Sequence, residues 1–545
     1  MDFQRLFLFL IFSFSLMMVW DGWQRYQHPQ AVQIAATATS DLPVATLKAA
    51  PGVAETTIVQ QSVKPVSGKI IKVKTDFLDA EINTLGGDIQ HLDFLKHSDG
   101  QDKSKHFVLF EKGAGTHNYV AQSGLLGAGM PNHTSLFSAE QDHYELSGSA
   151  DQLQVRLTAD GANGIKVTKL LTFHKGSYVI DVAYEIENNT AAALNTSSAY
   201  FQFIRDGVDP VGGSKMVPTY TGAAVYTEKE KFQKVGFSDI DKAKVNYPKE
   251  SDNGWVGMLQ HYFVAAWLPK DKTNREFFTR KLDGGLYSSG VVLPVPAIAA
   301  GQKAVISVPL YAGPAQSNLN DIAPGLGLTV DYGWLTILAT PIFWMLTFIQ
   351  GIVHNWGVAI IVLTLLIKLL FFPLSAASYR SMAKMRLVAP KLEKIKLQYA
   401  NDRERLNRAM MDLYKTEKIN PLGGCLPVII QIPVFIALYW SILASVEMRN
   451  APFFGWITDL SAADPFYVLP ILMGASMFIQ SRLNPVPPDP MQAKLMQIMP
   501  IAFSVVFFFF PAGLVLYSIV NNALSIAQQW YITRSTEVEG VKAKR

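Results

Sequence analysis

The chain has 545 residues, of which 49% are hydrophobic and 17% are charged, and its mean hydropathy is +0.16. A soluble protein of this length would carry about 25% charged residues, so the composition excludes an ordinary soluble protein and indicates a lipid-embedded part joined to a water-facing part. The lone cysteine, Cys425, excludes an intramolecular disulfide. A net charge of +4 is too small to indicate a nucleic-acid partner, and we expect no DNA binding.

The chain begins with an apolar run over residues 6–20, which contains no charge and follows Arg5. Because no small-x-small cleavage site comes directly after it, we expect an uncleaved membrane anchor; a cleaved signal peptide is the alternative. Residues 27–65 are rich in Ala, Thr, Val, Gln and Pro without periodicity, which is typical of a flexible linker.

Residues 68–318 alternate between apolar and polar positions, with turn residues between the runs. The clearest example is the pair of runs 165–173 and 178–186, which flank His174-Lys-Gly-Ser177 and predict a β-hairpin with one buried face. A β-sandwich of about 250 residues is the most economical fold for this part. Its histidines scatter without metal-ligand spacing, so we expect no metal site.

The last third of the chain contains five further apolar runs, separated by polar or proline-containing links. They predict five membrane-spanning helices, at 357–372, 427–443, 466–479, 495–510 and 512–527. Several runs have only 14–17 residues, fewer than the ~20 that cross a hydrocarbon core, so we also expect local thinning of the bilayer.

The segment before the first of these runs, 326–350, carries Trp334, Phe343, Trp344 and Phe348 and no charge after Asp331. We expect an amphipathic helix lying in the membrane interface, and an additional span is the alternative.

The links between the runs differ in charge. Segment 374–419 has 11 basic and 5 acidic residues (11 − 5 = +6), whereas 444–465 has 1 basic and 3 acidic residues (1 − 3 = −2). The positive-inside rule places the first segment in the cytoplasm and the second outside. Both termini then lie in the cytoplasm and the β domain lies in the periplasm of a bacterial inner membrane. The predicted fold class is therefore a polytopic α-helical membrane protein with six transmembrane helices and a large periplasmic all-β sandwich domain.

The cytoplasmic segment 374–419 predicts two short amphipathic helices in an antiparallel hairpin, with Pro390 expected to break or kink the first. Its basic side chains would bind anionic lipid, ribosomal RNA or an acidic protein, or serve only as a topological signal. The candidate partner surface consists of Arg380, Lys384, Arg386, Lys391, Lys394, Arg403 and Arg405.

The sequence lacks the residues that several classes of membrane enzyme and transporter need. All ten histidines precede residue 355, and the five predicted spans contain no Asp or Glu. This excludes histidine-dependent and aspartyl intramembrane proteases, and it leaves proton coupling through a buried carboxylate without support. The sequence contains no G-x-x-x-x-G-K-[ST] motif for ATP hydrolysis. We therefore expect a protein that is not an enzyme and that needs no cofactor or metal.

One charged residue, Lys368, lies inside an apolar run, five residues before Pro373. At ~1.5 Å per helical residue, its Cα lies about 7–8 Å from the cytoplasmic end of the span. Two interpretations are open: a lysine that snorkels to the headgroups, and a cation in a functional pocket.

Uncharged polar residues recur in the predicted spans at similar depths. They are Thr364, Gln431, Ser476, Gln480, Gln497, Ser518, Asn521, Asn522 and Ser525. Interhelical hydrogen bonding would explain some of them. So many, with one cation and no acid, indicate a hydrated, positively charged groove that accepts polar or acidic peptide.

Six stretches of the sequence match a known family. They are Ser381-Met-Ala-Lys-Met-Arg386, Asn420-Pro-Leu-Gly-Gly-Cys-Leu-Pro427, Gln431-Ile-Pro433, Ala451-Pro-Phe453, Asp459-Leu-Ser461 and Pro511-Ala-Gly-Leu-Val-Leu-Tyr517. Through them the chain resembles the YidC-type membrane protein insertases of Gram-negative inner membranes over essentially its whole length. The resemblance implies an N-terminal anchor, a periplasmic β-sandwich, an interfacial helix and a five-span core around a groove open to cytoplasm and lipid.

The resemblance also implies partners and site residues. Nascent membrane proteins would be the clients, inserted alone or with the Sec translocon, with membrane lipids and the ribosome as further candidate partners. The groove cation of the family is usually arginine, and the matching residue here is Lys368. Lysine keeps the charge but lacks the two-pronged geometry of a guanidinium group. The expected client-binding residues are Lys368, Thr364, Gln431, Tyr517, Ser518 and Asn521, with helix packing as the alternative role of Thr364 and Tyr517.

Eight segments are predicted from these patterns. They are an anchor (1–25), a linker (26–67), the β domain (68–318), an interfacial helix (319–350), a second transmembrane helix (351–373), the cytoplasmic hairpin (374–419), transmembrane helices three to six (420–530) and a basic cytoplasmic tail (531–545).

The expected mechanism needs no external energy source, because hydrophobic transfer of ~0.8 kcal/mol per buried methylene would drive an apolar client segment into lipid. The groove would only lower the barrier that dry hydrocarbon presents to the polar flank of the client. A small-solute transporter and a membrane-anchored envelope enzyme are the alternatives, although the sequence shows neither internal repeats nor a catalytic cluster.

Overall fold

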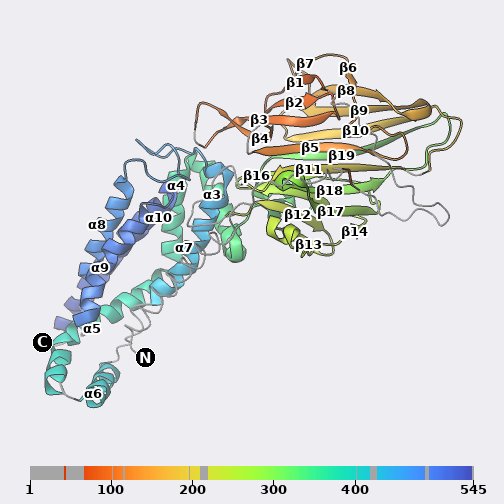
Figure 1. Ribbon diagram of the computed structural model, residues 1–545. Coiled ribbons are helices and arrows are strands. Elements are labelled where there is room, and N and C mark those ends of the chain that lie inside the picture. Colours follow the sequence, from red (N-terminus) through yellow and green to blue (C-terminus); the bar gives the residue numbers. More distant parts are fainter. Residues whose placement is uncertain are drawn as a thin grey trace.

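The computed structural model describes residues 42–43, 67–100, 102–113, 117–195, 197–208, 219–399, 402–417, 426–484 and 490–542. The predicted anchor, nearly all of the predicted linker, and Cys425 lie outside these residues. In Figure 1 the β domain lies to one side and a bundle of helices lies to the other.

The N-terminal part is a β-sandwich of two sheets, as the sequence predicts. In the described residues the first sheet has the strand order β14-β17-β18-β11-β5-β4-β3-β2-β1-β7, and the second has the order β13-β12-β15-β16-β19-β10-β9-β8-β6. The strands of the first sheet are β1 (Ile70–Lys74), β2 (Leu78–Asn83), β3 (Asp88–Ser98), β4 (His106–Lys112), β5 (Asn118–Leu126), β7 (His143–Glu145), β11 (Ser198–Asp206), β14 (Glu250–Ser251), β17 (Arg275–Lys281) and β18 (Leu286–Pro294). Those of the second are β6 (Ser138–Ala139), β8 (Gln152–Asp160), β9 (Ile165–His174), β10 (Val179–Asn188), β12 (Gly222–Thr227), β13 (Lys231–Val235), β15 (Trp255–Gln260), β16 (Phe263–Trp267) and β19 (Lys303–Pro314).

The predicted hairpin is confirmed as the antiparallel pair β9 and β10, with Phe173 opposite Ile180. Gly176, in the turn between them, has a φ of +66°, a conformation that glycine adopts without strain. Along β10 buried and half-buried residues alternate, so one face of the strand packs into the sandwich and the other lies nearer to solvent. The local pattern of the sequence therefore determined this pairing.

The C-terminal part is helical. The helices are α3 (Thr336–Val353), α4 (Trp356–Leu370), α5 (Phe372–Gln398), α6 (Arg403–Thr416), α7 (Leu426–Ala444), α8 (Val468–Leu483), α9 (Pro490–Phe507) and α10 (Ala512–Lys542); a short α2 (Phe237–Asp241) belongs to the β domain. The short 3-10 helices are η1 (Ala162–Gly164), η2 (Asp283–Gly285), η3 (Ser317–Asp321), η4 (Leu326–Thr329), η5 (Gly333–Leu335) and η7 (Val446–Met448). Each of the five apolar runs of the sequence falls largely on one helix.

Length and composition identify few complete spans in the part of the chain that the structure describes. Helix α3 is long and apolar enough to cross a membrane, and α4 with α5, which meet at a bend of 67°, would make a second crossing if they form one broken span. Shorter apolar helices lie at Gln431–Ala444, Val468–Leu483 and Ile498–Phe507.

Helix α3 has two distinct faces. Ile337, Trp344, Phe348 and Ile352 are exposed on one of them, whereas the opposite face packs against α4 and α7. An exposed apolar stripe of this kind is suited to contact with lipid.

Helices α5 and α6 form a hairpin at the end of the bundle that is far from the β domain (Figure 1). Val388 and Leu392 of α5 pack against Tyr414 of α6. Helix α5 continues through Pro390, so the helix is not broken there, whereas the alternative, a kink, stays a prediction. The apolar contacts on either side of Pro390 hold the helix together where the proline removes one backbone hydrogen bond.

The link between α7 and α8 contacts the β domain. Val446 of η7 belongs to the same buried cluster as the β-sandwich core. The Arg449 guanidinium carbon lies 5.2 Å from the ring centre of Phe107 and 5.6 Å from that of Phe263. His261 donates a hydrogen bond of 2.9 Å to the Leu443 carbonyl. The acidic link and the basic α5–α6 hairpin thus lie at opposite ends of the helices.

Candidate functional site

Lys368 lies on the last turn of α4 and is buried within the bundle, with 8% of its surface exposed. Its Nζ atom donates a hydrogen bond of 2.6 Å to Ser525 Oγ on α10. Among the described residues no carboxylate lies within ion-pair distance of this ammonium group. A buried charge that only stabilised the fold would be paired with an opposite charge, because desolvation of an unpaired ion is costly.

The surface of α10 that faces Lys368 carries a polar stripe, which consists of Ser518, Asn522, Ser525 and Gln529. Successive members are four, three and four residues apart, so they share one face of the helix. All four are at most 9% exposed. A polar stripe inside an apolar bundle must find hydrogen-bond partners there.

The stripe has partners of two kinds. Ser518 and Ser525 donate to carbonyls of their own helix, those of Leu514 and Asn521. Asn522 donates to Ser476 Oγ on α8 at 3.2 Å, and Gln529 donates to the Leu483 carbonyl at 3.1 Å. The stripe therefore joins α10 to α8 and, through Ser525, to α4. Gln529 was missed in the sequence because it follows the apolar run, although its spacing from Ser525 would have identified it.

The other predicted groove residues lie around this core. Thr364, one turn from Lys368, is fully buried and donates to the Ile360 carbonyl at 2.6 Å. Tyr517 is 2% exposed, and its ring centre lies 6.3 Å from that of Phe435 on α7. Gln431 on α7 and Asn521 on α10 are half-buried. Within the described residues, Ser525 is the hydrogen-bond partner of Lys368, and none of the predicted groove residues donates to or accepts from its ammonium group.

The basic residues of the predicted cytoplasmic surface divide into two groups. Arg386 donates to the carbonyls of Arg482 and Leu483 at the end of α8, Lys391 pairs with Glu417 at 2.5 Å, and Arg405 pairs with Asp402 at 3.2 Å. Arg380, Lys384 and Lys394 are exposed. The side chain of Arg403 is not among those that the structure describes. Three of the seven residues therefore hold the hairpin and the end of α8 in place.

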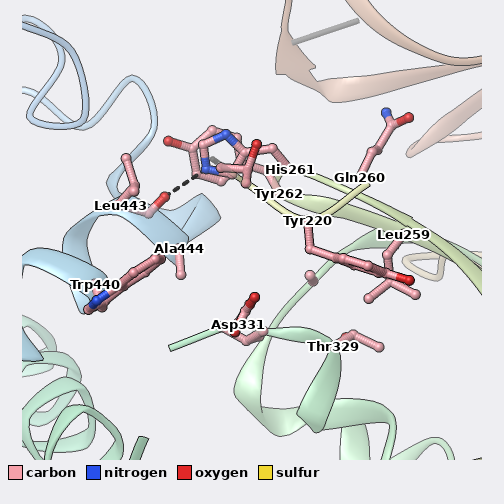
Figure 2. A pocket seen from close by; sticks show the side chains of 13 residues that line it. Tyr220, Leu259, Gln260, His261, Tyr262, Thr329, Asp331, Trp440, Leu443 and Ala444 are labelled. Atoms are coloured by element: carbon pink, nitrogen blue, oxygen red, sulfur yellow. Dashed lines mark hydrogen bonds between the residues drawn. The ribbon is translucent and has the colours of Figure 1, made fainter. Parts of the chain in front are cut away.

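A second candidate is a small cavity between the β domain and the end of α7, lined by Tyr220, His261, Asp331 and Trp440 among others (Figure 2). Three of its polar side chains have partners in the protein, whereas the buried side-chain amide of Gln260, which also lines it, has none in the described residues. Asp331 pairs with Lys234 at 2.5 Å, Tyr220 donates to the Ala223 carbonyl at 2.5 Å, and His261 donates to Leu443. The cavity lies at the junction of the two parts.

Two buried ionisable groups of the β domain form a pair that links its sheets. Lys169 Nζ on β9 lies 3.6 Å from Asp88 Oδ1 on β3, and both side chains are 2% exposed. The same Nζ donates to the Gly86 carbonyl at 3.0 Å. Burial raises the pKa of Asp88 to about 6 and lowers the pKa of Lys169 to about 8. In the described residues no cluster of His, Cys, Asp or Glu could hold a metal ion.

Two family models cover almost all of the described chain. The YidC periplasmic domain matches residues 70–345, and the 60Kd inner membrane protein family matches residues 348–539. This chain belongs to the YidC family. The boundary between the two matches falls within α3, so the family's periplasmic part ends where the helical bundle begins.

Curated relatives of the family match over the full length. The membrane protein insertase YidC of Nitrosospira multiformis is 54% identical over 98% of this chain and 98% of its own. The insertase YidC of Methylobacillus flagellatus is 55% identical over 100% of this chain and 99% of its own. A crystal structure of an active YidC insertase with its first transmembrane domain resolved is 18% identical, with a TM-score of 0.41 over 85% of this chain and 95% of its own. That structural similarity is too low to add to the sequence matches.

Proposed function

We infer that this chain is a membrane protein insertase and chaperone of the inner membrane, and that it is not an enzyme. The full-length match to insertases of the YidC family carries this conclusion. Membership of this family gives no support to the two alternative functions, a small-solute transporter and a membrane-anchored envelope enzyme. The clients are membrane proteins in the course of synthesis.

We further propose that the N-terminal anchor and the five apolar runs make six transmembrane helices, with both termini in the cytoplasm and the β domain in the periplasm. Two observations support this topology. The segment with a net charge of +6 forms the α5–α6 hairpin far from the β domain, and the link with a net charge of −2 contacts the β domain. The short apolar helices are consistent with a core that thins the bilayer.

The proposed insertion site is the space around Lys368 and the polar stripe of α10. Lys368 is an ammonium group within an apolar bundle, and in the described residues no acid neutralises it. Such a group attracts an acidic or polar client flank, and the hydroxyl and amide groups nearby lower the cost of moving that flank out of water. Hydrophobic transfer of the apolar client segment into lipid then drives insertion.

We also propose that the exposed Arg380, Lys384 and Lys394 form the part of the hairpin that is available to a cytoplasmic partner, such as the ribosome or anionic lipid. Cooperation with the Sec translocon is proposed from the resemblance of the sequence.

The charge of Lys368 provides the test. Two variants, Lys368→Glu and Lys368→Arg, are reconstituted in vesicles and supplied with a client whose translocated tail is acidic. We expect Lys368→Glu to lower insertion by about tenfold or more and Lys368→Arg to retain most of it, because the acidic tail would meet a like charge in the first variant. A client with a neutral tail serves as the control. Equal insertion of the acidic client by both variants would contradict the electrostatic role.

A further inference from the structure

Lys368 and Ser525 form a defined hydrogen bond between two helices. A polar groove alone would not need such a fixed contact. It joins two helices whose residues are 157 positions apart, and both side chains are buried, at 8% and 3% exposure. The Nζ–Oγ distance of 2.6 Å is short for a hydrogen bond between an ammonium group and a hydroxyl. The geometry holds a flexible side chain at one place in the bundle.

The second hydrogen bond of Ser525 determines its role in this contact. Its hydroxyl donates to the Asn521 carbonyl of its own helix at 2.8 Å. A serine hydroxyl has one hydrogen, so Oγ can act only as an acceptor toward Lys368. The bond to Asn521 also selects the side-chain rotamer of Ser525, which directs the Oγ lone pairs toward α4.

The consequence for Lys368 follows from the number of its donors. An ammonium group has three N–H groups, and Ser525 accepts from one of them. Within the described residues the other two have no acceptor, so they remain available to a carboxylate or carbonyl of a client. The four-carbon stem of lysine has several rotamers of similar energy, and one fixed hydrogen bond greatly reduces their number.

We propose that Ser525 is a positioning residue for membrane insertion: it holds the Lys368 ammonium group at the centre of the groove and presents two of its N–H groups to the acidic flank of a client. This inference rests on the proposed function, since it assigns Ser525 a role through Lys368. Ser525 stabilises the orientation of the cation and does not itself bind the client.

The test compares two clients that differ only in the charge of the translocated tail, one with Asp residues and one with Asn at the same positions. Insertion into proteoliposomes is measured by protease protection, and the readout is the ratio of acidic to neutral client inserted. We expect Ser525→Ala to lower this ratio roughly fivefold, the equilibrium equivalent of one hydrogen bond. A purely structural role would lower the insertion of both clients and leave the ratio unchanged.

Three further variants make the outcome specific. Ser525→Thr keeps the hydroxyl and should keep the wild-type ratio. Ser525→Cys is close in size but accepts hydrogen bonds weakly, so it should lower the ratio even if the alanine variant does not fold. Ser535→Ala is the matched control, because Ser535 is also on α10 and donates to a carbonyl of its own helix, that of Tyr531, but is exposed. It should leave the ratio unchanged.

Lys368→Met separates this inference from the proposed function. If Lys368→Met lowers the ratio and neither Ser525→Ala nor Ser525→Cys does, the positioning role is wrong and the function stands. If Lys368→Met leaves the ratio unchanged, the electrostatic function itself is wrong. If both single variants lower the ratio, we expect the double variant to lower it no further than Lys368→Met alone, because the two residues act as one unit. Additive losses would overturn the inference.

Discussion

The two parts of the molecule each bury a lysine, and they treat it differently. In the β domain, Lys169 is paired with Asp88 and bonded to a backbone carbonyl. In the helical bundle, Lys368 is bonded to a single hydroxyl, and no acid accompanies it in the described residues. The first arrangement compensates the charge within the fold. The second arrangement leaves the charge without an opposite charge. A structural role does not require such an unpaired charge, whereas attraction of acidic clients does.

The largest effect is expected from breaking the compensated pair. Asp88→Ala would leave the Lys169 ammonium group buried without its partner, and we expect the free energy of unfolding to fall by about 3–5 kcal/mol. Chemical denaturation of the full chain in detergent, followed by tryptophan fluorescence, measures this loss. Asp88→Ala combined with Lys169→Met is the control and should recover most of the loss, since no charge remains buried. A single variant as stable as the wild type would contradict the pairing.

A smaller effect of opposite sign is expected in the bundle. Lys368→Met removes a buried charge and leaves no acid unpaired, so the free energy of unfolding should stay unchanged or rise by about 1 kcal/mol. The same variant should insert acidic clients less well. Thermal unfolding in detergent, together with the vesicle assay, checks both expectations. A clear loss of stability would show that Lys368 is a structural residue, as Lys169 is.

A third ionisable group, the half-buried Glu447, lies at the junction and provides a further comparison. Burial raises its pKa from 4.5 to about 7, and Tyr311 and Tyr332 lie near it. Between pH 4.5 and about 7 the folded chain therefore keeps a proton that the unfolded chain has released. The stability that Glu447 contributes is fully present below the lower pH and is lost as the pH rises through the upper one.

Glu447→Gln should make the thermal unfolding temperature less dependent on pH between pH 5 and pH 8, with the gain over the wild type largest at pH 8. Calorimetry at three pH values measures this dependence, and Glu230→Gln, an exposed acid of the β domain, is the control. If the pH dependence of the Glu447→Gln variant equals that of the wild type, the carboxyl group of Glu447 in the wild-type protein does not keep its proton over this pH range, and the expectation is wrong.

Local periodicity explains why much of the fold could be predicted. Alternation over residues 165–173 and 178–186 depends on neighbouring residues only, and it gave the hairpin of β9 and β10 correctly. The same alternation places Lys169 on the buried face. Its partner, Asp88, comes from the other sheet, and no local pattern could have identified it.

The contacts of the site were less predictable for the same reason. Lys368 stood out as the one charge in an apolar run, but its partner depends on how α10 is rotated about its axis against α4. Ser525 was one of nine polar candidates, and nothing in the sequence separated it from the others. Of the two effects expected at Pro390, a break or a kink, the break does not occur, because contacts with α6, distant in sequence, hold α5 together there.

The contacts of Arg449 with the rings of Phe107 and Phe263, of Val446 with the sandwich core and of His261 with Leu443 attach the β domain to the bundle, besides the chain that leads from β19 into α3. A domain held only by its chain can swing freely, whereas a domain that is also held by several separate contacts cannot. Any load applied to the β domain from the periplasm would then be transmitted mechanically to the end of α7.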